Sequence, residues 1–250
     1  MKFTPRNILG PLYAIGLATT LAACNDMDIQ IDGDGVPLSE FDTSGDAPTG
    51  VTLAGPDNIV VTTGDAFTIE VEGDEEVTDK LRFDRDGDNF AVYREGKNWS
   101  GDNTATIRVT IPSLDTMNIA GSGTIEADRL SGDATVSIGG SGKASAASVE
   151  AGRLDVNIGG SGSFTGSGTA DSLDFNLGGS GEASMAEITV GSADINIAGS
   201  GKAIFASGGD VEANIFGSGT VTVTGGATCK ANTVGSGKLI CDDVETEPNT

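Results

Sequence analysis

The sequence contains no histidine, and this absence removes whole classes of catalytic and metal site. Without an imidazole the chain cannot build a Ser-His-Asp triad or a Cys-His pair. It also cannot supply a histidine-dependent zinc site. Chemistry carried by carboxylates, such as the acid and base pair of a glycosidase, remains open.

Basic residues and large aromatic side chains are also scarce. There are 14 Lys and Arg against 37 Asp and Glu, which gives a formal net charge of −23. A polyanion repels the phosphates of nucleic acids, so we expect no nucleic-acid partner. Aromatic residues make up 5% of the chain and include one Trp, whereas Gly occurs 38 times. So few large side chains predict a thin core, which suits stacked sheets better than a broad sandwich.

Residues 1–23 have the features of a processing segment rather than of a folded element. Lys2 and Arg6 precede a mostly apolar stretch over residues 8–21, which is too short for a comfortable membrane-spanning helix. The segment ends in Leu-Ala-Ala-Cys, which resembles the lipobox of bacterial lipoproteins. The resemblance implies that Cys24 is acylated and anchors an exported chain in the cell envelope, at the outer membrane or the periplasmic face of the inner membrane. The alternative is an ordinary secretory signal with an incidental Cys.

Residues 24–50 follow this segment and are strongly acidic, with seven acids and no base. That composition predicts a solvated, flexible tether between the lipid and the folded domain. Loose calcium binding is a weaker alternative for the closely spaced acids Asp26, Asp28, Asp32 and Asp34.

Apart from one out-of-phase copy at Gly166, the tripeptide Gly-Ser-Gly occurs seven times at a mean interval of 19 residues. Its copies begin at Gly121, Gly140, Gly160, Gly179, Gly199, Gly217 and Gly235. A phosphate-binding loop is used once and opens a helix, whereas these copies are followed by alternating or small residues. The nearest approach to a Walker motif, "SIGGSGKA", lacks the leading Gly and has Ala144 where Ser or Thr is needed. We therefore interpret the glycines as repeated corners.

Apolar residues occupy fixed positions around each corner, at two, four and six residues before it and four after it. The column two before the corner is Ile119, Ile138, Ile158, Leu177, Ile197, Ile215 and Thr233. Alternation of this kind puts the apolar residues on one face of a strand. One such unit cannot bury that face alone, but stacked units can. The sequence therefore predicts an all-β fold, a parallel β-solenoid over residues 119–244 with coils about 4.8 Å apart.

Two polar columns are expected on the outside of the coils. One lies three residues before the corner and contains Asn118, Asn157, Asn176, Asn196, Asn214 and Asn232. We expect these amides to form a structural ladder, with a binding role as the alternative. The other lies five residues before the corner and contains Asp155, Asp174, Asp194 and Glu212. Stacked carboxylates repel unless they are solvated or bind a cation, so a solvated stripe is favoured over a catalytic one.

Residues 51–118 read as short strands and turns that cap or extend the solenoid. Asp86-Gly87 is a favoured hairpin dipeptide between two alternating segments. Asp84, Asp86 and Asp88 have the spacing of the first ligands of an EF-hand loop, which makes them weak calcium candidates. Asn89 stands where that loop needs Gly, so we favour the hairpin.

Cys229 and Cys241 lie six residues before and six after Gly235, in columns that both face the core. An exported protein permits disulfides, and a bridge here would hold the last coil together. Two buried free thiols are the alternative. Residues 245–250 are expected to form a frayed tail.

With these features in view, the chain resembles the head GIN domain family of auto-transporter adhesins from about Phe41 to Asp243. The resemblance rests on "GVTLAGPDNIVVTTGD", "KLRF", "VTIPSLDTMNIAGSG" and the recurring "NIGGSG" corners. It implies a solenoid-like β architecture on an exported bacterial protein, and it supplies no catalytic residues.

The sequence as a whole therefore predicts a lipid-anchored envelope protein with a structural, adhesive or protein-binding role. We expect it to be neither an enzyme nor a cofactor binder, and its oligomeric state stays open. Its expected partners are the membrane and an envelope protein or glycan. The alternative is a polysaccharide-binding or polysaccharide-acting protein that uses the acidic column.

Overall fold

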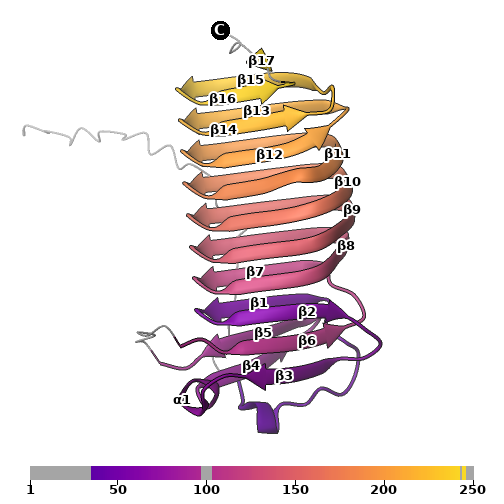
Figure 1. Ribbon diagram of the computed structural model, residues 1–250, viewed down its shortest axis with the longest axis vertical. Coiled ribbons are helices and arrows are strands. Elements are labelled where there is room, and N and C mark those ends of the chain that lie inside the picture. Colours follow the sequence, from indigo (N-terminus) through magenta and orange to yellow (C-terminus); the bar gives the residue numbers. More distant parts are fainter. Residues whose placement is uncertain (1–34, 97–102, 243, 246–250) are drawn as a thin grey trace, which may run out of the picture.

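The computed structural model describes residues 35–96, 103–242 and 244–245. Most of them belong to strands stacked along one axis (Figure 1). The helical elements of this part of the chain are η1 (Leu38–Glu40) and α1 (Glu75–Thr78). The strands are β1 (Gly50–Gly55), β2 (Asn58–Thr63), β3 (Thr68–Glu72), β4 (Leu81–Asp86), β5 (Asn89–Arg94), β6 (Thr106–Ile111), β7 (Thr116–Gly121), β8 (Thr124–Gly140), β9 (Lys143–Gly160), β10 (Ser163–Gly179), β11 (Glu182–Gly199), β12 (Lys202–Ser207), β13 (Asp210–Gly217), β14 (Thr220–Thr224), β15 (Thr228–Gly235), β16 (Lys238–Cys241) and β17 (Val244–Glu245).

From β7 onward the chain winds as a parallel β-solenoid, which confirms the predicted fold. Each Gly-Ser-Gly corner joins two sheets. The pre-corner sheet contains β1, β5, β7, β13, β15 and the C-terminal arms of β8 to β11. The post-corner sheet contains β2, β6, β12, β14, β16 and the N-terminal arms of β8 to β11. The corners align because Gly121 pairs with Gly140, and Gly140 with Gly160.

The core lies between these two sheets, where the predicted apolar columns meet. Ile138, Val156 and Phe175 are fully buried from the pre-corner side, as are Ile125 and Phe164 from the post-corner side. They are buried because every second residue of a strand faces the same side, and because the same position faces that side in every coil. Each coil thus completes its core only against its neighbours.

The corners require glycine because successive backbones come very close. Gly199 has a φ of +136°, and a Cβ there would lie 2.1 Å from the carbonyl oxygen of Gly179. The same carbonyl accepts a hydrogen bond from the Ser200 amide at 2.9 Å. Corner stacking therefore excludes a side chain on sterics as well as on backbone conformation.

The return from one coil to the next is made by continuous strands in the middle of the stack. In β8 to β11 the second arm of one coil runs without a break into the first arm of the next, which makes strands of 17 or 18 residues. Each long strand bends, and the register shifts between Gly166 and Gly168 where β10 pairs with β9.

The coil formed by β1 and β2 is out of sequence order. β1 lies between β5 and β7 and runs parallel to both, and β2 lies in the same way between β6 and β8. Gly55 pairs with Gly121, so Gly55-Pro56-Asp57 takes the place of a Gly-Ser-Gly corner. The chain therefore forms β1 and β2 first and then runs through β3 and β4 to the end of the stack. It continues through β5 and β6, which lie on one side of the β1–β2 coil, and passes to β7 on the other side (Figure 1).

Antiparallel strands cover the end of the stack beyond β5 and β6. β3 pairs with β6, and β4 forms the expected hairpin with β5. Val36 makes a bridge to Phe83, and the Phe41 ring lies 5.6 to 6.3 Å from the rings of Phe67, Phe83 and Phe90. Val36 and Phe41, which fall within the tether predicted over residues 24–50, thus contact this cap, and the Phe41 ring is partly buried against it.

Candidate functional site

The outward asparagines of the pre-corner sheet lie in line, one on each coil. The Asn176 amide donates to Asn157 Oδ1 at 3.0 Å, and Asn196 donates to Asn176 at 3.1 Å. The same bond runs from Asn214 to Asn196 at 3.1 Å and from Asn232 to Asn214 at 3.0 Å. Each inner amide therefore donates and accepts along the axis, as a ladder requires.

Asn118 belongs to the same column, but Ser137 separates it from the ladder. Its amide donates instead to Thr52 Oγ1 at 3.3 Å, and Thr52 donates to Asn89 Oδ1 at 2.9 Å. A second polar chain thus links the out-of-order coil to both neighbours. Thr52 and Asn89 precede the Gly-Ser-Gly repeat, so alignment of the repeat gives no signal for them; the pairing of β1 with β5 and β7 brings them together with Asn118.

The acidic stripe, Asp155, Asp174, Asp194 and Glu212, runs beside the ladder on the same sheet. Its members are register partners on successive coils. Arg153 spans the first two, with Nε 3.0 Å from Asp155 Oδ1 and Nη2 2.9 Å from Asp174 Oδ2. At the other end Lys230 Nζ lies 3.3 Å from Glu212 Oε1.

Sequence reasoning missed both cations of the stripe because they do not form a column of their own. Partial burial raises the pKa of the Asp174 carboxyl above its ordinary value; Arg153 offsets part of this rise, and Asp155 and Asp194 add to it. None of the stripe residues lines the groove described next. This arrangement suits a solvated, partly neutralised face better than a paired acid and base in a cleft.

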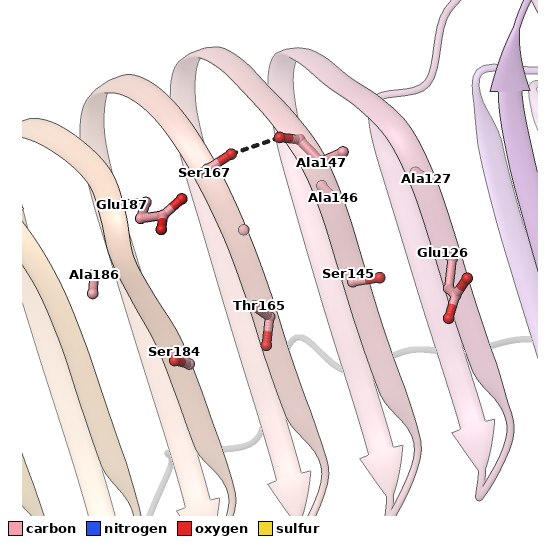
Figure 2. Close-up of a pocket in the computed structure, with 11 residues that line it drawn as sticks. Glu126, Ala127, Ser145, Ala146, Ala147, Thr165, Ser167, Ser184, Ala186 and Glu187 are labelled. Carbon is pink, nitrogen blue, oxygen red and sulfur yellow. Dashed lines mark hydrogen bonds between the residues drawn. The ribbon is translucent and has the colours of Figure 1, made fainter.

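A groove of about 480 Å³ crosses the outside of the post-corner sheet from β8 to β11 (Figure 2). Its polar lining side chains are Glu126, Ser145, Thr165, Ser167, Ser184 and Glu187, with Ala and Gly between them. Glu126, Ser145, Thr165 and Ser184 are register partners on four successive coils. The groove therefore presents a row of one carboxylate and three hydroxyls along the solenoid axis.

The groove exists because the long strands bend where their side chains are small. The register shifts between Thr165 and Ser167 on β10, and again after Met185 on β11. Gly166 lines the groove, and a Cβ there would lie 3.1 Å from Ile188 Cδ1. Ser167 Oγ donates to the Ala147 carbonyl at 2.6 Å. Sequence periodicity does not reveal the groove, because it depends on these local shifts.

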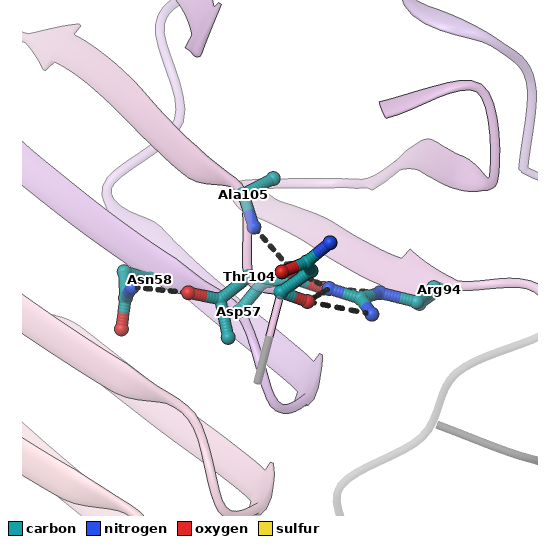
Figure 3. Close-up of polar contacts among 6 residues, drawn as sticks. Asp57, Asn58, Arg94, Thr104 and Ala105 are labelled. Carbon is teal, nitrogen blue, oxygen red and sulfur yellow. Dashed lines mark hydrogen bonds and ion pairs between the residues drawn. The ribbon is translucent and has the colours of Figure 1, made fainter. Parts of the chain in front are cut away.

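A buried ion pair joins the out-of-order coil to the cap (Figure 3). Asp57 is 1% exposed and Arg94 8%. Asp57 Oδ2 accepts from Arg94 Nε at 2.9 Å, and Oδ1 accepts from Arg94 Nη2 and from the Ala105 amide, the latter at 2.7 Å. Arg94 also donates to the Asn103 carbonyl at 3.3 Å. These bonds satisfy both carboxylate oxygens of Asp57 within the chain, as buried charges require.

The last coil carries a disulfide between Cys229 on β15 and Cys241 on β16, whose Cα atoms are 6.5 Å apart. The bond crosses from one sheet to the other, 12 residues apart in sequence. Phe216 and Val234 lie near this end on adjacent coils, 51% and 65% exposed.

The weak calcium candidates lie on the β4–β5 hairpin. Asp84 accepts from the Arg85 amide at 2.8 Å, while Asp86 pairs with Asn89 at the hairpin end. Within the described ranges no group of three or more His, Cys, Asp or Glu is arranged to hold a metal ion. Cys24, the signal segment and Asp26, Asp28, Asp32 and Asp34 lie outside the described residues. None of the helices in the described part of the chain is long and apolar enough to cross a membrane.

Comparison with known proteins identifies one family. A family model described as "Putative auto-transporter adhesin, head GIN domain" matches residues 47–227. A structure from Bacteroides fragilis described as a putative adhesin has a TM-score of 0.71 at 17% identity, covering 78% of this chain and 92% of that one. A putative lipid binding protein from Parabacteroides distasonis has a TM-score of 0.60 at 23% identity, with coverage of 78% and 93%. A putative adhesin from Parabacteroides merdae has a TM-score of 0.58 at 17% identity, with coverage of 78% and 92%. Among curated proteins none matches this chain in sequence.

Proposed function

Because the chain belongs to the head GIN domain family of auto-transporter adhesins, we propose that it is a lipid-anchored protein of the bacterial cell envelope with a non-catalytic binding role. The solenoid would serve as a rigid platform that presents repeated polar columns to a partner. The carrying observation is the asparagine ladder, which ties successive coils together and so holds the outer columns of the solenoid in one repeating arrangement. Rigid elements hold a binding surface more precisely than loops do.

The anchor part of the proposal rests on the lipobox-like sequence that ends at Cys24. It is tested with the full-length chain and a Cys24→Ser variant expressed in a Gram-negative host. We expect the parent protein to fractionate with membranes and to carry the mass of attached acyl chains, and the variant to lose both. An unchanged distribution and mass would contradict lipid anchoring while leaving the binding role open.

The binding part is tested with full-length protein purified in detergent. Whole envelope extracts, polysaccharides and calcium are offered in turn, and calorimetry follows any hit. Saturable binding without change in the bound molecule is the expected result. Release of new reducing ends from a polysaccharide, abolished by Asp174→Asn or Asp194→Asn, would instead establish the enzymatic alternative.

Lipid binding, the description that one structural relative carries, is not favoured for this chain. The polar lining side chains of the groove are hydroxyls and carboxylates, and its apolar lining consists of small residues. A lipid site needs an apolar cavity that buries most of an acyl chain. We therefore place the expected ligand among hydrophilic molecules.

A further inference from the structure

We infer that the groove across β8 to β11 is a binding site for an uncharged polysaccharide chain that lies along the solenoid axis. The inference deepens the proposed binding role and rests on it. It assigns that role to the post-corner sheet rather than to the ladder or the acidic stripe.

The direction of the groove excludes a peptide that binds by adding a strand. The backbone groups of β8 to β11 already pair from coil to coil along the axis. The row from Glu126 to Ser184 crosses these strands, so an occupant of the groove would lie across them and meet side chains instead of free backbone groups.

The spacing of the row favours a sugar chain over an extended peptide. The row repeats once per coil, at about 4.8 Å, whereas side chains on one face of an extended peptide repeat at about 6.6 to 6.8 Å. A pyranose chain offers hydroxyls on every residue, with a repeat close to the coil spacing. Successive sugars can therefore meet Ser145, Thr165 and Ser184 in phase.

The polar groups of the row are free to bind. Within the described part of the chain, the hydroxyls of Ser145, Thr165 and Ser184 make no hydrogen bond to another residue. Each can donate and accept, as sugar hydroxyls do. Glu126 and Glu187 add acceptors on β8 and β11, the outermost of the four strands.

The charge of the site selects the class of polysaccharide. Two carboxylates and no Lys or Arg are among the described residues that line the groove, and the whole chain carries a formal charge of −23. An acidic polysaccharide would be repelled both locally and at long range. An uncharged chain avoids that repulsion, and the methyl groups of the Ala lining contact its C–H surfaces.

The test uses full-length protein in detergent and a panel of neutral glucans and mannans, with polygalacturonate and chitosan oligosaccharides as charged probes. Thr165→Val removes one hydroxyl of the row at nearly constant shape. Its matched control is Thr222→Val on β14, three coils away in the same column and outside the groove. Ala186→Trp fills the groove from an exposed position.

At least one neutral polysaccharide is expected to bind saturably in calorimetry. Thr165→Val should weaken that binding by about three- to tenfold, the worth of one hydrogen bond, while Thr222→Val leaves it unchanged. Ala186→Trp should abolish it, with the far-ultraviolet circular dichroism spectrum as the check on folding. No binding to any neutral chain, tighter binding to polygalacturonate, or equal effects of the two Thr variants would overturn the inference. Chitosan is attracted to any polyanion, so its binding counts against the inference only where Thr165→Val weakens it more than it weakens binding of a neutral chain. If the Thr165 and Ala186 variants still bind envelope extracts as the parent does, the groove is refuted but the binding role survives.

Discussion

Replacing Asp57 by Asn should destabilise the N-terminal end of the solenoid by about 3–5 kcal/mol, the usual cost of leaving one member of a buried ion pair without its partner. The carboxylate accepts three hydrogen bonds, two from Arg94 and one from the Ala105 amide. Asn retains one acceptor oxygen and turns an NH₂ group toward the guanidinium. Arg94, 8% exposed, then keeps the Asn103 carbonyl and the one amide oxygen as acceptors, but it has lost its anionic partner and the bond to Nε.

The control is an exposed ion pair in the same region. Arg108 on β6 and Glu72 on β3 form a contact of 3.1 Å, with side chains 50% and 60% exposed. Solvent screening reduces such a pair to about 0–1 kcal/mol, so Glu72→Gln should change stability little. The double variant Asp57→Leu with Arg94→Met removes both charges and should recover much of the loss.

The assay must separate the two ends of the stack, because coils of a solenoid can unfold in stages. Urea unfolding followed by circular dichroism gives the global change. Native-state hydrogen exchange at the amides of β1, β5 and β6 gives the local opening free energy. If Asp57→Asn changes the local value no more than Glu72→Gln does, the pair does not hold the cap and the reasoning is refuted.

Three further predictions concern the repeat. Asn196→Ala removes two ladder bonds and Asn157→Ala removes one. The free energy of unfolding in urea should therefore fall more for the Asn196 variant, by up to about 1 kcal/mol for each exposed bond. Equal losses would contradict the ladder. Gly199→Ala should cost about 3 kcal/mol or more, because strain adds to a clash with backbone. Gly226 also has a positive φ, but no atom lies within 4 Å of the Cβ that Gly226→Ala would add, so this control should cost only the backbone strain. Equal losses of stability for the Gly199 and Gly226 variants would show that the close approach of backbones is unimportant. Because the pKa of Asp174 is raised on folding, its carboxyl contributes stability below the unfolded pKa, and this contribution is lost as pH rises through the folded value. Asp174→Asn should therefore gain in Tm relative to the parent as pH rises from about 4 to 7, and a pH-independent difference would refute that assignment.

The regular part of this fold could be predicted from the sequence because one pattern recurs at a fixed interval. Ile138, Val156 and Phe164 are buried where the columns place them. The ladder from Asn157 to Asn232 follows from the same alignment, since residues at one position of successive coils must face each other. A sequence repeat constrains the position of each residue strongly when every coil must pack against the coils next to it.

The remaining features depend on contacts that the repeat does not encode. Gly55-Pro56-Asp57 does not match Gly-Ser-Gly, so β1 gives no sign that it pairs with β7 across 66 positions. The ion pair of Asp57 and Arg94 joins the turn between β1 and β2 to the end of β5. Neither segment contains a Gly-Ser-Gly corner, so the repeat does not predict this contact. The groove requires a bend at Gly166, which alternation along an ideal strand cannot predict.

The coil of β1 and β2 cannot fold in the order in which its residues are synthesised and exported. In the repeat, each new arm pairs with one made 17 to 20 residues earlier. Gly50 on β1, by contrast, pairs with Asn89, 39 residues later, and with Thr116, 66 residues later. Long loops must therefore close before β1 gains a partner on either side, and such closures slow folding. β1, the first strand in the described part of the chain, therefore gains its second neighbour only after the cap and β7 have been synthesised.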